Sequence, residues 1–231
     1  MKKLGMIGGL GPESTIEYYR LLFEAYRSRV QDGSAPRIII NSIDMNRLVG
    51  WVTAGAYPEI VSYVVDEIKR LAAAGAAFGI ISANTPHIVF DEIRQRSQLP
   101  LISIIEATCE FAKSQGLKRL ALFGTRFTMQ GSFYPKVFEQ SGISLAVPLA
   151  DEQEYIHDKY MNELVKGDIR PTTREALLRI VDHIIERDHI EGLILGGTEL
   201  PLIIQDLGER KIALLDTTRI HVNAAIAEML A

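Results

Sequence analysis

Short apolar runs alternate with longer amphipathic stretches along nearly all of the 231 residues, and this alternation limits the fold more than any other feature. The runs are rich in Val, Ile and Leu without in/out alternation, which is typical of strands covered by helices on both faces. Strands alternating with helices in this way form parallel sheets. The sequence therefore predicts an α/β protein with strands at Leu4–Gly8, Arg37–Ser42, Gly79–Ser82, Leu101–Ile102, Arg119–Phe123, Ser144–Ala146, Gly192–Leu195 and Ile212–Leu215.

Helices are expected after each of these strands, and two of them are well defined by their apolar spacing. In Glu59–Gly75 and in Thr173–Glu186, large apolar residues recur every three or four positions. Gly75 is placed to end the first of these helices, because glycine adopts the left-handed conformation that follows many helices. Thr172 or Thr173 is expected as the N-cap of the second, since a threonine hydroxyl can accept a hydrogen bond from the first turn.

The order of elements repeats along the chain. Gly79–His87 ("GIISANTPH") and Gly192–Leu200 ("GLILGGTEL") are each an apolar run that opens into polar side chains, and each follows an amphipathic helix. We expect two similar domains, residues 1–115 plus 210–231 and residues 116–209, each a mostly parallel sheet flanked by helices. Ligands bind beyond the carboxyl ends of parallel strands. Two such domains facing one another would place both stretches in one active-site cleft between them.

Composition excludes several functional classes. A formal net charge of −4 gives no basic face for nucleic acid. A single cysteine allows no intrachain disulfide, and the histidines show no metal-ligand spacing, so no metal site is expected. No run approaches the roughly 20 apolar residues that span a bilayer, and the N-terminal apolar run is too short for a signal peptide. We expect a soluble, cytoplasmic protein without membrane contact.

The stretch "GGLGPEST" follows the first strand and opens a helix. It does not match the dinucleotide pattern Gly-x-Gly-x-x-Gly, because Ser14 stands where the third glycine would be, and the P-loop lysine is absent. Two interpretations remain. The stretch is a tight turn at a helix start, or the backbone N–H groups around Leu10 and Gly11 bind a carboxylate or phosphate at the helix N-terminus.

Hydrogen-bonding side chains follow three of the expected strands: Asn84, Thr85, Thr125, Thr128, Thr198 and Glu199. Residues of these types also cap helices, so each alone is open to a structural explanation. Their matching places in both halves favour a shared ligand site. His87 is a candidate base, a structural residue or a surface residue. Cys109 is expected on a helix, with its side chain in the protein core.

Five stretches taken together, "MIGGLGPEST", "ANTPH", "LFGTRFTM", "LGGTEL" and "LLDTTRIH", resemble the aspartate/glutamate racemase family. The resemblance covers almost the whole chain in the right order. It implies two similar α/β domains with the active site between them, and often a homodimer. It also implies isomerase activity, namely racemisation at Cα of an acidic amino acid, without pyridoxal phosphate or another cofactor. In this family two cysteines, one from each domain, move the proton.

Ala83 and Gly197 occupy the positions that the resemblance assigns to the two cysteines, and neither side chain can carry a proton. A positioned acid or base contributes roughly 10²–10⁴ in rate, so the two-thiol reaction should be nearly abolished. The possible replacements are Glu199, His87, Ser82 or a water molecule. A carboxylate in this role would need its pKa raised by burial.

The binding groups that the resemblance implies are better represented. The cradle for the substrate's α-carboxylate and amine corresponds to the residues Leu10, Gly11, Asn84, Thr85 and Thr198, with Thr125 and Thr128 lining the same pocket. For the side-chain carboxylate, the resemblance points to Arg47 and, shifted by one residue, to Lys166. Arg47 suits this role because its guanidinium can make two parallel hydrogen bonds to a carboxylate.

Four hypotheses stay open at the level of sequence. The chain is a racemase-family enzyme with altered acid–base groups, or a decarboxylase or cis–trans isomerase of dicarboxylates. Alternatively, it is a non-catalytic binding protein for an acidic amino acid or dicarboxylate. It could also be an engineered double substitution of an active parent, since alanine is a common replacement for cysteine.

Overall fold

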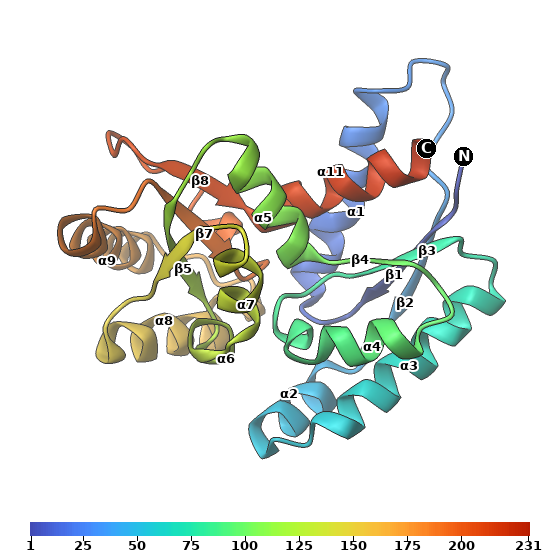
Figure 1. Cartoon of the computed structure of the whole chain (residues 1–231), viewed down its shortest axis with the longest axis horizontal. Helices are drawn as coiled ribbons and strands as arrows, with labels where there is room; N and C mark the ends of the chain where they lie inside the picture. The colour runs from blue at the N-terminus through green and yellow to red at the C-terminus, as the bar shows by residue number, and fades with distance from the viewer. The chain divides into compact units, whose positions relative to one another are not determined.

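The computed structural model describes all residues from 1 to 231, and the chain divides into two compact units. Unit 1 consists of Met1–Ala107 and Thr218–Ala231, and unit 2 of Thr108–Thr217. Each unit contains one four-stranded parallel sheet flanked by helices (Figure 1), which confirms the predicted fold class. None of the helices combines the length and the hydropathy that a bilayer crossing requires.

The strands of unit 1 are β1 (Leu4–Gly8), β2 (Ile38–Ser42), β3 (Phe78–Ile81) and β4 (Leu101–Ile102), in the spatial order β2-β1-β3-β4. Its helices are α1 (Pro12–Arg27), α2 (Met45–Ala54), α3 (Tyr57–Ala73), the 3₁₀ helix η1 (Thr85–Val89), α4 (Phe90–Arg96) and α11 (Thr217–Leu230), with α5 (Ile104–Ser114) leading into unit 2. All strand pairs are parallel, so β1 and β3 end at the same edge of the sheet.

Two layers of helices enclose this sheet. Tyr18, Leu22, Val222 and Ile226 of α1 and α11 are fully or almost fully buried in one core cluster with Leu4 and other residues of β1 and β3. On the opposite face α3 packs against β1, where Leu71 lies close to Gly5. Figure 1 shows α1 and α11 on one side of the sheet and α3 on the other. Burial on both faces explains why these strands lack alternation of apolar and polar residues.

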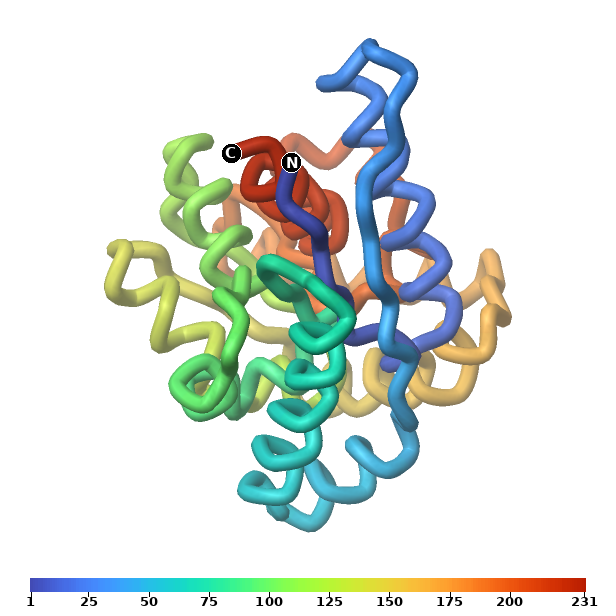
Figure 2. Tube along the Cα trace, turned by 90° about the vertical axis from the view of Figure 1, so that its right-hand side faces the viewer, coloured from blue at the N-terminus to red at the C-terminus, as the bar shows by residue number.

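The two chain ends meet within unit 1 (Figure 2). The backbone N–H of Lys2 donates to the carbonyl of Met229 at 2.9 Å, and the Lys2 ammonium pairs with Glu228. The last helix is therefore held against the start of β1.

The strands of unit 2 are β5 (Arg119–Gly124), β6 (Ser144–Ala146), β7 (Gly192–Gly196) and β8 (Ala213–Asp216), in the order β6-β5-β7-β8. Its helices are α6 (Arg126–Gln130), α7 (Phe133–Glu139), α8 (Ala150–Asn162), η2 (Leu164–Lys166), α9 (Pro171–Asp188) and α10 (Leu200–Ile203). One core cluster joins β5 and β7 to α8 and α9, through Phe123, Ile156, Val181 and Leu195 among others.

The two sheets repeat the same arrangement, with β1, β2, β3 and β4 corresponding to β5, β6, β7 and β8. One detail differs from the expected boundaries. The sequence analysis assigned residues 210–231 to the first domain, whereas β8 pairs with β7 in the second sheet. The chain completes the second sheet with β8 and only then returns to unit 1 with α11. The local sequence does not show that this strand and the helix after it belong to different domains. The remaining expected boundaries stay a prediction.

The expected N-cap of α9 was wrong. The helix begins at Pro171 with Arg170 as its N-cap, two residues before Thr172 and three before Thr173. Proline favours the first helical position because its fixed φ suits the helix and its missing N–H is not needed there. The hydroxyl of Thr173 donates instead to the buried carboxylate of Glu163.

Candidate functional site

The positions of Ala83 and Gly197 are equivalent in the two sheets. Ile7 of β1 pairs with Ile81 of β3, and Phe123 of β5 pairs with Leu195 of β7. Ala83 and Gly197 each lie two residues beyond the paired residue of the third strand. The tripeptides 83–85 and 197–199 therefore begin at matching places at the carboxyl edges of two sheets with the same strand order.

The turn after β1 contains two glycines with positive φ, Gly9 and Gly11, and the surroundings of Gly9 also leave no room for a side chain. Gly9 has φ +79°, and a Cβ there would lie 2.4 Å from the carbonyl oxygen of Ile43. The N–H of Gly9 donates to the hydroxyl of Thr15 at 2.9 Å. The N–H groups of Leu10 and Gly11, by contrast, donate to no protein acceptor, and they directly precede Pro12, the first residue of α1. This start of α1 leaves two backbone donors at the strand edge.

After β3, the chain passes directly into buried polar side chains. The Ser82 hydroxyl donates to the carbonyl of Ile7 at 2.9 Å, which ties β3 to β1 and gives Ser82 a structural role. Asn84 is 3% exposed and precedes η1 without capping it through its side chain. Thr85 is half-buried at the first position of η1.

Both ring nitrogens of His87 are hydrogen-bonded to the backbone. Its Nδ1 lies 3.0 Å from the carbonyl of Ala83, and its Nε2 accepts from the N–H of Ile104 at 3.4 Å. These partners select the neutral tautomer protonated at Nδ1. Burial, reinforced by the nearby His221, lowers the pKa of His87 to about 3. His87 is thus held as a neutral structural residue, and neither nitrogen is left for a substrate in this arrangement.

His221 of α11 is a second buried histidine in unit 1. Its Nε2 donates to the carbonyl of Ile102 at 3.0 Å, and its Nδ1 accepts from the hydroxyl of Tyr18 at 2.9 Å. Burial lowers the pKa of His221 to about 4. The two neutral imidazoles join α11 and η1 to the strand β4 and the start of α5.

After β5, Thr125 acts as the N-cap of α6. Its hydroxyl accepts from the N–H of Thr128 at 3.3 Å and lies 3.2 Å from the hydroxyl of Thr128. Both side chains are buried. These hydrogen bonds fix both hydroxyls at the start of α6, at the strand edge where pocket-lining hydroxyls are expected from the sequence.

After β7, the aromatic ring of Tyr160 fills the space beside Gly197. A Cβ at position 197 would lie 2.4 Å from Cε2 of Tyr160 and 3.0 Å from both Cζ and the phenol oxygen. Tyr160 belongs to α8 and is 6% exposed. Any side chain at position 197 would therefore require this ring to move.

The phenol of Tyr160 also donates a hydrogen bond to Oε2 of Glu199. The hydroxyl of Thr198 donates to the same oxygen at 3.1 Å, and all three side chains are buried. Burial, together with the negative charge of Glu199, raises the pKa of the Tyr160 phenol above its usual value. Unit 2 therefore contains a buried phenol–carboxylate pair directly beside Gly197.

Arg47 is exposed near the start of α2, where Asp44 caps the helix by accepting from the N–H groups of Asn46 and Arg47. Its guanidinium carbon lies 4.6 Å from the ring centre of Trp51 and 4.9 Å from that of Tyr63. Arg47 has no carboxylate partner, although most other arginines of the chain are ion-paired. Two aromatic rings therefore orient a guanidinium that is free to bind an anion.

Lys166 is the last residue of η2 and is exposed, again without an ion-pair partner. The nearby carboxylate of Glu163 is already bound by Lys159 at 2.9 Å.

Cys109 lies within α5 and is 2% exposed, with Sγ 3.8 Å from the carbonyl of Val137. Burial raises the pKa of this thiol, so it stays protonated and unreactive.

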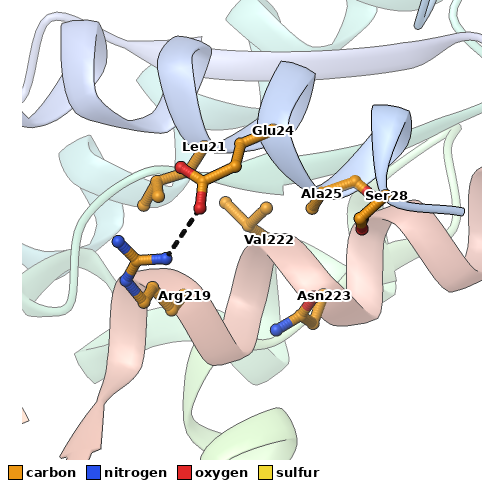
Figure 3. Close-up of a pocket in the computed structure, with 7 residues that line it drawn as sticks. All are labelled: Leu21, Glu24, Ala25, Ser28, Arg219, Val222 and Asn223. Carbon is orange, nitrogen blue, oxygen red and sulfur yellow. Dashed lines mark hydrogen bonds and ion pairs between the residues drawn. The ribbon is translucent and has the colours of Figure 1, made fainter.

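Two surface hollows lie elsewhere. One lies between α1 and α11 (Figure 3), where Arg219 Nη1 is 3.4 Å from Glu24 Oε1 beside Val222. The other lies at the amino edge of the second sheet, where Glu191 accepts hydrogen bonds from the N–H groups of Lys118 and Arg119. Neither hollow includes a residue from the carboxyl ends of the strands. No group of three or more His, Cys, Asp or Glu side chains is arranged around a common point.

Sequence reasoning did not find Tyr160. The tyrosine lies 37 positions before Gly197 and sits among charged residues of an ordinary amphipathic helix. Only the packing of α8 against β5 and β7 brings its ring to the strand end. The one available signal was indirect, namely a glycine where a side chain is expected, which indicates that another group fills the space.

Residues 7–225 match the family profile described as Asp/Glu/Hydantoin racemase. The chain is 23% identical to the broad specificity amino-acid racemase RacX of Bacillus subtilis (strain 168), over 99% of this chain and 98% of that protein. It superimposes on an aspartate racemase homologue from Pyrococcus horikoshii OT3, PH1733, with a TM-score of 0.86 and 33% identity. A candidate Asp/Glu racemase from Yersinia pestis gives a TM-score of 0.90 and 31% identity. Both structures cover this chain fully and are themselves fully covered.

Proposed function

Because the chain belongs to the Asp/Glu/Hydantoin racemase family, we propose that it catalyses cofactor-independent proton transfer at Cα of a small acidic amino acid. The observation that carries this proposal is the equivalence of the two strand ends. Residues 83–85 and 197–199 follow corresponding strands of two sheets, and each set places buried polar side chains at the edge where ligands of parallel sheets bind.

The binding groups that we propose are of two kinds. In unit 1 we propose that the backbone N–H groups of Leu10 and Gly11, which have no protein acceptor, bind the α-carboxylate, together with the side chains of Asn84 and Thr85. In unit 2 we propose Thr125, Thr128 and Thr198 as substrate-binding side chains. For the side-chain carboxylate we propose Arg47, because its guanidinium is oriented by two rings and unpaired. Lys166, which is exposed and unpaired, is the second cation of this proposal.

The chain lacks ionisable side chains at the two positions where the family resemblance places the acid and the base. Neither the methyl group of Ala83 nor the hydrogen of Gly197 can exchange a proton, and each positioned acid or base contributes roughly 10²–10⁴ in rate. Among the replacements considered, His87 and Ser82 are engaged by backbone groups. Glu199 is the remaining ionisable side chain at these strand ends, so we propose it as the source of base catalysis.

Proton exchange in D₂O tests this function directly. The protein is incubated with L- and D-aspartate and with L- and D-glutamate, and loss of the Cα proton signal is followed by ¹H NMR. We expect enzyme-dependent exchange on at least one enantiomer. If no acidic amino acid loses its Cα proton faster than in buffer alone, the proposed activity is wrong. The homodimer that the resemblance implies stays a prediction, which light scattering after gel filtration would check.

A second candidate function is binding without turnover. It is favoured by the same two positions, since the proton carriers are missing while the unpaired Arg47 and the free N–H groups of Leu10 and Gly11 remain. A ligand at 100 times its Kd stabilises a protein by about 2.7 kcal/mol. A thermal shift with aspartate, glutamate or a dicarboxylate, together with no exchange in D₂O, would select this candidate over the first.

A further inference from the structure

Gly197 is required because the side chain of Tyr160 lies beside it, and not because of its backbone conformation. Nine glycines of the chain have positive φ, and Gly197 is not among them, so any residue could adopt its conformation. The restriction is steric, because the ring of Tyr160 lies 2.4 Å from where a Cβ would be placed. Gly197 and Tyr160 are therefore complementary, with the ring occupying the volume that a side chain at 197 would take.

Of the three Tyr160 atoms that lie around the ideal Cβ position of residue 197, only the phenol oxygen carries an exchangeable proton. It lies 3.0 Å from the ideal Cβ site of residue 197. The edge of the ring and the phenol oxygen therefore lie in the space directly around the position where a side chain at 197 would begin. Tyr160 of α8 thus brings a phenol to the strand end where the resemblance places a cysteine.

A carboxylate that can accept the phenol proton, that of Glu199, is hydrogen-bonded to Tyr160. The hydrogen bond of the phenol goes to Oε2 of Glu199, which also accepts from Thr198 at 3.1 Å. Glu199 is 1% exposed and Tyr160 is 6% exposed. A carboxylate bonded to a phenol in a dry environment can take the phenol proton as the phenol oxygen gains another, which makes the pair suitable for proton relay.

We propose that Tyr160 and Glu199 are the proton-transfer pair of unit 2, with the phenol oxygen of Tyr160 contacting Cα of the substrate. The assignment rests on the proposed function. In the forward step the Cα–H bond breaks and its proton moves to the phenol oxygen, while the phenol's own proton moves to the Glu199 carboxylate. The electron pair stays on the substrate as an enediolate. In D₂O the protons on the phenol and on Glu199 exchange with solvent before the reverse step. Glu199 then returns a deuteron to the phenol, and the phenol delivers its deuteron to Cα.

The burial of the pair fits a relay better than a free phenolate. Burial and the Glu199 charge disfavour ionised Tyr160, and the relay never requires it, since the phenol gains one proton as it loses another. Unit 1 has no counterpart, because Ala83 carries no ionisable group and His87 is engaged by Ala83 and Ile104. The pair therefore serves one face of the substrate, and exchange with solvent should outpace racemisation.

Variants that remove one atom or one charge test the pair. Tyr160→Phe keeps the ring and its packing but removes the phenol oxygen, and Glu199→Gln keeps the size and an acceptor but removes the base. For each we expect kcat for Cα-proton exchange in D₂O to fall about 100-fold or more, with KM changed less than threefold. Tyr155→Phe is the matched control, since Tyr155 lies on the same helix and contacts Lys159. We expect it to exchange at the wild-type rate.

The outcomes separate this assignment from the proposed function. If the wild type exchanges and both Tyr160→Phe and Glu199→Gln stay within threefold of its kcat, the pair is overturned while the function stands. A lowered kcat in a variant whose thermal melting is unchanged supports the pair. If one variant fails to fold, the other decides alone, because the two substitutions perturb different atoms. No exchange by the wild type on any acidic amino acid overturns the function and the pair together.

Discussion

The loops after β3 and β7 begin at equivalent positions but are filled in opposite ways. After β3, the space at the strand end is filled by a residue of the same loop, because the His87 ring donates a hydrogen bond from Nδ1 to the carbonyl of Ala83. After β7, a residue from a distant helix fills the space, as Tyr160 lies against Gly197 and bonds to Glu199. One topology therefore supports two different side-chain environments, and only the second contains a proton-carrying pair.

The largest expected effect comes from restoring thiols. Ala83→Cys with Gly197→Cys should give little racemase activity, because the ring of Tyr160 occupies the space of the second side chain. Adding Tyr160→Leu opens that space, and we expect the triple variant to racemise L-aspartate at least about 100-fold faster than the double variant. Chiral chromatography of the product measures this. Equal rates for the two variants would show that the ring moves aside easily.

The second effect is the loss of stability in acid that the two buried histidines of unit 1 should cause. His87 and His221 have pKa values lowered to about 3 and about 4, whereas unfolded histidine titrates near 6.5. Between these values the unfolded chain binds more protons, so stability is lost as pH falls below 6.5. At pH 5 each histidine costs about 2 kcal/mol of the free energy of unfolding.

Urea unfolding at pH 7.5 and pH 5.0 measures this loss. His87→Gln and His221→Gln should each reduce the pH dependence by about half. His183→Gln is the control, because His183 is exposed in unit 2 and pairs with Glu152. An unchanged pH dependence in both buried-histidine variants would show that other groups cause it.

The third effect compares the two loops through the free energy of unfolding of two single substitutions, Gly197→Ala and Ala83→Gly. Gly197→Ala should destabilise the protein by about 1–3 kcal/mol, since its methyl group would overlap Tyr160. Ala83→Gly should cost only about 0.5–1 kcal/mol through backbone entropy. Urea unfolding at neutral pH gives both values. In the background of Tyr160→Leu the cost of Gly197→Ala should largely disappear, and a cost that persists there would point to a cause other than the ring.

The smallest effect concerns ligand affinity through Arg47. Arg47→Lys keeps the charge but loses the planar fork and much of the stacking on Trp51 and Tyr63. We expect Kd for an acidic amino acid to rise about tenfold, which corresponds to about 1.4 kcal/mol. Titration calorimetry measures it. Arg27→Lys, at a second stacked arginine over Phe23, should leave Kd unchanged; a similar rise there would exclude a specific role for Arg47.

Local sequence patterns determined the elements of this protein. All eight strands were predicted within about one residue at their ends, because runs of Val, Ile and Leu buried on both faces look alike in any parallel sheet. The repeated arrangement was also predictable, since similar stretches recur in the same order. Ala83 and Gly197 could be paired from sequence because each directly follows such a strand.

Tertiary packing decided what surrounds those strand ends. Tyr160 reaches Gly197 across 37 positions and His87 lies near His221 across 134, and no periodicity encodes either approach. The same holds for β8, which joins the second sheet although it directly precedes a helix of the first unit. Apolar patterns specify which face of an element is buried, whereas its partner depends on shape complementarity between elements far apart in the chain. The side-chain environment of Gly197 therefore depends on the packing of α8 beside the end of β7 and could not be predicted from the sequence of either segment alone.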